Sequence, residues 1–262
     1  MSGTGPGRRP TVIELRQYTL LPGRRDELIE LFEREFVETQ EEAGMAVLGQ
    51  FRDLDDPDRF VWLRGFADIE TRRDALSAFY GGPVWAAHGP RANATMADSD
   101  NVLLLRPAPG SRGPATASSV RPAVGAAAPD RFVAAALWHF PPGGEAGEGV
   151  EGVDDREAGD DGGVRLILDR LVPLLAQTGP APFAVLTTEP AANTFPGLPV
   201  RTGENVVAVL TSYPDEGAHR RHLADVMAHP LVRDEILPGI ERARTEAPEL
   251  LRLVPTGRSL IR

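Results

Sequence analysis

Hydrophobic and polar residues alternate along short stretches of the chain, and longer stretches with helical spacing separate them. From Val12 to Tyr18, Ile13 and Leu15 fall on one face and the charged residues on the other, as in a β-strand. Further on, the spacing predicts helices at 26–42, about 69–80 and 84–97, and strands at 45–54, 60–66 and 101–106. This β-α-β-β-α-β order is that of a ferredoxin-like module.

The same pattern occurs a second time along the chain. Residues 60–76 are echoed 147 positions later by 207–223, Tyr18–Gly23 is echoed 120 positions later, and 103–107 is echoed by 251–255. Three repeats in the same order indicate duplication and fusion of one module. The second copy predicts strands at 132–140, 183–188, 205–213 and 250–254, and helices at 164–178, 216–228 and 231–245.

We therefore expect an α+β protein in which two ferredoxin-like modules form a pseudo-dimeric α/β barrel. The predicted modules span residues 11–107 and 131–262. Residues 108–130, rich in Pro, Ala, Gly and Ser, are interpreted as a linker, and 143–163 as a flexible acidic insertion in the second module. Residues 1–10 are interpreted as a disordered leader.

Composition narrows the possible chemistry. The 262 residues include no cysteine and no lysine, which excludes disulfides, thiolate ligands and Schiff-base lysines. A net charge of −10 argues against nucleic acid or an anionic membrane as the main partner. No apolar run approaches the roughly 20 residues of a membrane span, and the N-terminus lacks the apolar core of a secretion signal. We expect a soluble cytoplasmic protein from a GC-rich bacterium.

Polar and aromatic residues gather on the first and third predicted strands. If Ile13 and Leu15 meet the helices, the opposite face points between the two sheets. The expected lining there is Glu14, Arg16, Tyr18, Trp62, Arg64 and Phe66. An apolar pocket with a few convergent polar groups is the usual form of a small-molecule site. The alternative is structural, with Glu14 paired to Arg16 or Arg64 and the aromatic rings packed.

The second copy does not repeat these residues. Ala134, Ala136 and Trp138 stand where Glu14, Arg16 and Tyr18 stand in the first, so one site, mostly in the first half, is expected, with Trp138 contributing to substrate binding. In the segment 80–91, Tyr80 and Trp85 accompany His88, which can act as a general acid or base or simply lie at the surface. His219, His222 and His229 are close in sequence, but their helix is expected to face solvent, so no metal site is predicted.

The first copy resembles the NIPSNAP family of the dimeric α/β-barrel superfamily. The resemblance rests on Ile13–Tyr18, Pro22–Gly23, Phe60–Phe66 and Phe79–Trp85, and continues through His88, Arg91, Ala92, Asn93 and Met96 to Asp98–Pro107. It covers residues 12–107 well and the second copy weakly. It implies the barrel fold and a superfamily that includes cofactor-free oxygenases and cyclases, haem enzymes, dehydratases and ligand-binding domains.

The leading hypothesis is an enzyme of bacterial specialised metabolism that needs no cofactor. It would oxygenate, cyclise or rearrange a hydrophobic or aromatic, polyketide-like molecule. Arg16 or Arg64 would hold an enolate or carboxylate and Tyr18 or His88 would move the proton. Trp62, Phe66 and Trp85 would shape the pocket, and Glu14 and Tyr80 would also contact the substrate. The alternatives are a binding protein without chemistry and a haem protein ligated by His88 or His139. A homodimer of the fused barrel is also considered.

Overall fold

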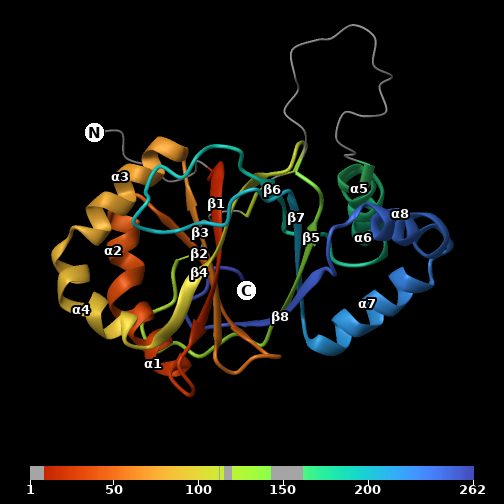
Figure 1. Ribbon diagram of the computed structural model, residues 1–262. Coiled ribbons are helices and arrows are strands. Elements are labelled where there is room, and N and C mark those ends of the chain that lie inside the picture. Colours follow the sequence, from red (N-terminus) through yellow and green to blue (C-terminus); the bar gives the residue numbers. More distant parts are fainter. Residues whose placement is uncertain (1–8, 112, 115–119, 143–161) are drawn as a thin grey trace, which may run out of the picture.

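The computed structural model describes residues 9–111, 113–114, 120–142 and 162–262. In these residues eight antiparallel strands close into one barrel, in the order β1-β3-β2-β8-β5-β7-β6-β4 (Figure 1). The strands are β1 (Val12–Leu20), β2 (Ala46–Asp53), β3 (Arg59–Phe66), β4 (Met96–Pro107), β5 (Phe132–His139), β6 (Ala184–Thr188), β7 (Val206–Tyr213) and β8 (Glu249–Pro255). The barrel therefore closes within a single chain.

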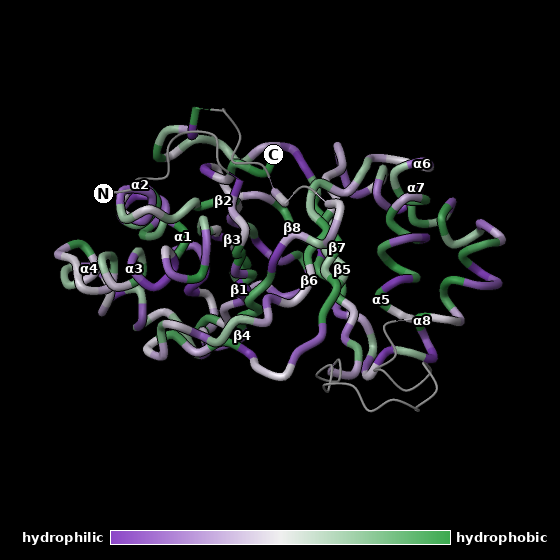
Figure 2. Tube along the Cα trace, turned by 90° about the horizontal axis from the view of Figure 1, so that it is seen from above, coloured by the Kyte–Doolittle hydropathy of each residue, from purple (hydrophilic) through white to green (hydrophobic). Residues whose placement is uncertain are grey.

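The helices lie on two opposite outer sides of the barrel (Figures 1 and 2). On the first side are α1 (Arg25–Leu31), a π-helical turn (Phe32–Phe36), α2 (Val37–Glu42), α3 (Ile69–Tyr80) and α4 (Pro83–Asn93). On the second are α5 (Gly162–Arg165), a π-helical turn (Leu166–Leu171), α6 (Val172–Thr178), α7 (Glu216–Ala228), a third π-helical turn (Val232–Ile236) and α8 (Leu237–Ala243). Each predicted helix and strand is present, with ends shifted by a few residues.

The strand register agrees with the sequence repeat. Arg16 pairs with Trp62 across β1 and β3, and Ala136, 120 residues later, pairs with Val209, 147 residues after Trp62. Likewise Leu15 pairs with Leu103, and Ala135 with Leu251. Each half therefore has the same order of neighbouring strands, β4-β1-β3-β2 and β8-β5-β7-β6.

The inside of the barrel is a hydrophobic core of mostly aliphatic side chains. Ile13 and Leu15 of the first half pack there with residues such as Leu137 and Leu210 of the second. The prediction that these two residues meet the helices is wrong, and so is the inward direction of the charged face: Tyr18, Trp62 and Phe66 belong to the cluster that packs under the first helices. The alternation of residues in β1 did not show which face meets the helices, because both faces of the strand are buried.

Two helices begin at equivalent aspartate caps. Asp68 accepts a hydrogen bond from the Thr71 backbone N–H at the start of α3, at 2.7 Å. Asp215 accepts one from the Ala218 N–H at the start of α7, also at 2.7 Å. Such caps satisfy an amide left free at a helix start.

The predicted N-terminal leader and the predicted insertion differ in part from expectation. Pro10, placed by the sequence in a disordered leader, is buried, and the Arg9 guanidinium donates to the Gly113 carbonyl. Gly162 and Gly163, placed in the flexible insertion, begin α5. The rest of that insertion, residues 143–161, and residues 1–8 lie outside the described residues.

Among the described residues, no helix combines the length and the apolar character that a membrane crossing requires.

Candidate functional site

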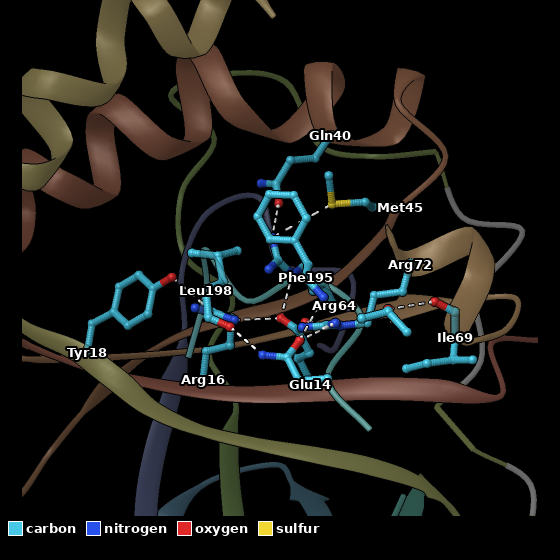
Figure 3. Close-up of polar contacts among 12 residues, drawn as sticks. Glu14, Arg16, Tyr18, Gln40, Met45, Arg64, Ile69, Arg72, Phe195 and Leu198 are labelled. Carbon is cyan, nitrogen blue, oxygen red and sulfur yellow. Dashed lines mark hydrogen bonds and ion pairs between the residues drawn. The ribbon is translucent and has the colours of Figure 1, made fainter. Parts of the chain in front are cut away.

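Three arginines converge on one buried glutamate beneath the first helices (Figure 3). Glu14 Oε2 accepts from Arg16 Nη1 at 2.6 Å and from Arg64 Nε at 2.7 Å, and Glu14 Oε1 accepts from Arg72 Nε at 2.6 Å. Strand β1 contributes Glu14 and Arg16, β3 contributes Arg64, and α3 contributes Arg72. We call Glu14, Arg16, Arg64 and Arg72 the guanidinium cluster. All four side chains are at most 1% exposed.

The cluster keeps its glutamate ionised. Burial alone would raise the pKa of Glu14, but the guanidinium groups of Arg64, Arg16 and Arg72 outweigh it and hold that pKa well below its usual range. Further acceptors lie around the arginines: Arg64 Nη1 donates to Gln40 Oε1 of α2 at 3.2 Å, and Arg16 Nε donates to the Tyr18 hydroxyl at 2.9 Å. The predicted pairing of Glu14 with Arg16 or Arg64 is thus observed with both.

Aromatic rings surround the arginines. The Arg64 guanidinium carbon lies 5.1 Å from the ring centroid of Trp62 and 5.6 Å from that of Phe66, and the Arg16 carbon lies 5.7 Å from the Trp62 centroid. These distances suit cation–π attraction. Trp62 and Phe66, predicted to line a pocket between the sheets, therefore pack around the charges on the helix side.

A pocket of about 500 Å³ lies beside the cluster. Its lining is Tyr18, Tyr80, Trp85, Asn93, Met96, Ala97, Asp98, Ser99, Asp100, Phe195, Gly197, Leu198 and Pro199. The pocket brings together three predicted site residues. They are Tyr18, predicted to transfer a proton, and Tyr80 and Trp85, predicted to contact the substrate. Tyr18 joins the pocket to the cluster, because its hydroxyl accepts from Arg16. Burial raises the pKa of Tyr18 although Arg16 opposes the rise, so its hydroxyl keeps its proton at neutral pH.

The second half supplies one wall of this pocket through the loop between β6 and β7. In that loop, Asn193 Oδ1 accepts from Arg72 Nη1 at 2.9 Å, and the Asn193 amide donates to the Leu198 carbonyl at 2.9 Å. Phe195 stacks on Tyr80 with centroids 5.9 Å apart, and the Thr194 hydroxyl donates to the Ile69 carbonyl at 3.2 Å. The site is thus built from both halves, although the polar residues come mostly from the first.

Other predicted site residues lie elsewhere. His88 of α4 is half-buried, with Nε2 3.6 Å from a Glu35 carboxylate oxygen, and it does not line the pocket. Trp138 packs with the separate apolar cluster under the second helices. His139 faces Glu204, with Nδ1 3.0 Å from the carboxylate, and it also lies outside the pocket lining.

The histidines of α7 have structural partners. His222 is buried between the hydroxyls of Thr178 and Tyr213, each 2.9 Å from a ring nitrogen, and His219 stacks on Phe132. The expectation that this helix face meets solvent is wrong for His222. Among the described residues, no group of three or more His, Cys, Asp or Glu side chains is arranged to hold a metal ion.

Several residues of the site escaped the sequence analysis. Arg72 and Asn193 reach the cluster from a helix and from the other half, and no local pattern pointed to either. Asp98 and Asp100 line the pocket at the start of β4. Residues 98–107 are part of the family resemblance, and this resemblance is the feature of the sequence that could have pointed to these two aspartates.

The NIPSNAP family model matches residues 13–112, the part of the chain that holds strands β1 to β4. No curated protein matches the chain. Solved structures that resemble the whole chain share its fold at low sequence identity.

Two of these structures are each called a "putative monooxygenase". The protein from Lactobacillus acidophilus is 12% identical, with a TM-score of 0.52 and 94% of each chain covered. The one from Fusobacterium nucleatum is 8% identical, with a TM-score of 0.55, covering 95% of this chain and 93% of that one. An anthrone oxidase-like protein is 13% identical, with a TM-score of 0.56, covering 94% and 92%. These likenesses concern the fold.

Proposed function

We propose that the protein is an enzyme that oxygenates a hydrophobic aromatic molecule, polyketide-like in character, without a cofactor. The observation that carries this proposal is an aromatic pocket lined by Tyr18, whose hydroxyl accepts a hydrogen bond from Arg16. The pocket's volume is within the usual range for small-molecule sites. The rings of Tyr80, Trp85 and Phe195 line the pocket, where a flat aromatic substrate can pack against them.

Tyr18 is suited to stabilise an enolate oxygen. Its oxygen accepts the Arg16 N–H, so its own proton is free to be donated to a ligand in the pocket. The adjacent guanidinium strengthens that donor, and burial removes competing water. Arg16 therefore acts through Tyr18 as a positioning residue. This arrangement is a preorganised donor aimed at developing negative charge, which lowers the barrier to forming an enolate.

A carboxylate can accept the proton that leaves the substrate carbon. Asp98 and Asp100 are the acids that line the pocket, whereas His88 lies outside it. In anthrone, for example, loss of a proton from the CH₂ carbon gives the enolate, which then reacts with O₂. One oxygen atom becomes the new carbonyl and the other leaves as water. The two broken C–H bonds supply the four electrons that reduce O₂, so anthrone plus O₂ gives anthraquinone plus water.

The fold supports a further part of the proposal, that each half is a ferredoxin-like module and the barrel a pseudo-dimer. The two halves share the strand order and the register offsets described above. The outer-face residues of β5 at the positions of Glu14 and Arg16 are Ala134 and Ala136. The second half therefore offers no matching charges, and one site in the pair carries the chemistry.

The test is oxygen consumption with anthrone as the probe substrate. Tyr18→Phe is expected to lower kcat about 100-fold, with a smaller change in KM, because a donor to the transition state is lost. Tyr213→Phe, which alters a buried tyrosine of the second half, serves as the matched control and is expected to leave turnover unchanged. Equal turnover by wild type and Tyr18→Phe would contradict the proposed role. Tight binding without product would favour the alternative of a non-catalytic metabolite-binding protein.

A further inference from the structure

The guanidinium cluster holds more positive than negative charge. Three arginines, which stay protonated in proteins, face one ionised glutamate. Within the described parts of the chain, no second carboxylate lies within 4.0 Å of these guanidinium nitrogens. Tyr18 is neutral and Gln40 and Asn193 are amides. A buried charge without a counter-charge is costly, so an excess of two positive charges here calls for an anion.

Specific donors in the cluster are also left without acceptors. The Nη2 atoms of Arg64 and Arg72 are buried and make no hydrogen bond to the described residues. Buried polar atoms are nearly always partnered, and an exception needs an explanation such as strain, a functional role or a bound water or ion. The Trp62 indole N–H nearby is likewise buried and unpartnered.

Asn193, in the loop between β6 and β7, supplies a hydrogen-bond acceptor to the cluster from the second half of the chain. Its carboxamide oxygen accepts from Arg72 Nη1 at 2.9 Å and also from the Phe195 backbone N–H at 3.0 Å. Phe195 and Leu198 of the same loop lie beside the cluster in Figure 3. A neutral amide satisfies the geometry of the guanidinium but not its charge.

Residues of the same loop contact both the pocket and the cluster. Phe195 and Leu198 line the pocket, and Asn193 donates to the Leu198 carbonyl. The loop belongs to the second half, and its residues 191–200 are exposed or half-buried. Its movement would join the pocket to the cluster without disturbing the barrel strands.

We infer that the guanidinium cluster is an anion subsite at the inner end of the aromatic pocket, and that the ligand is an aromatic carboxylate whose carboxylate replaces the Asn193 amide oxygen. The inference rests on the proposed function, because it uses the same pocket, and it adds the substrate class. A carboxylate suits the site because its two oxygens match the planar donors of a guanidinium, here Arg72 Nη1 and the unpartnered Nη2 atoms.

The direct test compares 2-naphthoate with its neutral isostere 2-naphthamide, by calorimetric titration of the full-length protein. The acid is expected to bind at least tenfold more tightly than the amide. Trp85→Ala is expected to weaken both ligands, because that ring lines the pocket. Equal affinity of acid and amide, or 2-naphthoate binding that Trp85→Ala leaves unchanged, would overturn the inference.

Asn193→Asp provides an internal anion at the same point. It is expected to weaken 2-naphthoate at least tenfold and 2-naphthamide less than twofold, and to raise Tm because it neutralises Arg72. Asn205→Asp, at the other end of the loop and bonded to the Pro141 carbonyl, is the control and should leave the ratio of the two affinities unchanged. A lower Tm for Asn193→Asp together with unchanged 2-naphthoate affinity would show that the cluster is not an anion-binding site.

Failure of this inference is distinguishable from failure of the proposed function. If anthrone is turned over while the acid and the amide bind equally, the anion subsite is wrong and the enzyme proposal stands. If 2-naphthoate binds as expected and anthrone yields no product, the subsite stands and the oxygenase proposal fails.

Discussion

Glu14 is the residue on which the buried charges of the first half depend. It accepts hydrogen bonds from Arg16, Arg64 and Arg72, which belong to two strands and a helix. The bonds to Arg64 and Arg72 span 50 and 58 residues of sequence. Its ionised side chain therefore fixes the position of α3 against β1 and β3, and it orients Arg16 toward Tyr18.

Replacing this carboxylate by an amide tests its role. Glu14→Gln leaves three buried guanidinium groups without a counter-charge, and we expect the free energy of unfolding to fall by about 3–5 kcal/mol. The measurement is urea denaturation at neutral pH. The control is Glu30→Gln, which removes an exposed partner of Arg34 and should change the free energy by less than about 0.5 kcal/mol. Similar values for the two variants would show that the cluster contributes no net stability through Glu14.

At the scale of elements, the equivalent helices α3 and α7 contribute different buried polar side chains. Each begins at an aspartate cap and packs on its half of the barrel. Helix α3 holds Arg72 against Glu14, whereas α7 holds His222 between Tyr213 and Thr178. The common cap gives a matched pair of variants for separating stability from function.

Removing either cap is expected to cost about 1 kcal/mol of unfolding free energy, because an amide at the helix start loses its acceptor. Asp68→Ala should in addition weaken 2-naphthoate binding, since α3 positions Arg72. Asp215→Ala should leave that affinity unchanged. Urea denaturation and calorimetric titration of both variants provide the comparison. Equal binding by the two variants would show that the start of α3 does not position the cluster.

At the scale of the whole molecule, the barrel separates two helical layers whose buried polar groups titrate differently. Burial lowers the pKa of His222 below the ordinary value of 6.5, and burial with help from Arg252 lowers that of His219. Thr178 donates its proton to the Leu174 carbonyl, so it accepts from His222 Nε2–H, and the Tyr213 hydroxyl donates to Nδ1. This network holds a neutral imidazole.

The sign of the resulting pH dependence follows from these directions. Below about pH 6.5 the unfolded chain binds protons at these histidines more readily than the folded one, so stability falls as pH drops. The loss from Glu14 begins only below its ordinary pKa of 4.5, because its folded-state pKa is lower still. Urea midpoints at pH 7.5, 6.5 and 5.5 should therefore decrease. In His222→Phe the decrease should be smaller, and an unchanged slope would exclude this histidine as its source.

The sequence by itself determined the order of elements and the duplication. The elements follow from local patterns, namely the alternation in 12–18 and 60–66 and the helical spacing of 26–42. The duplication follows from comparing the sequence with itself, which gives the offsets of 120 and 147 residues. The structure has the corresponding strands and helices, and its registers reproduce the offsets. Glu14, Arg16 and Arg64 were also recognisable as unusual, because charged residues on strands with two buried faces need partners.

Only the tertiary structure decided which way these residues point and what surrounds them. Both faces of β1 are buried, so alternation identifies two faces without saying which meets the second sheet. Ile13 and Leu15 fill the barrel because the facing strands also present aliphatic chains, and Glu14 and Arg16 turn to the side where Arg72, Gln40 and Asn193 supply polar partners. Gln40 lies 24 residues from Arg64 in the sequence, and Arg72 lies 58 residues from Glu14. Asn193 lies 121 residues from Arg72. Such long-range pairing leaves no local periodicity in the sequence, so it emerges only when the chain is folded.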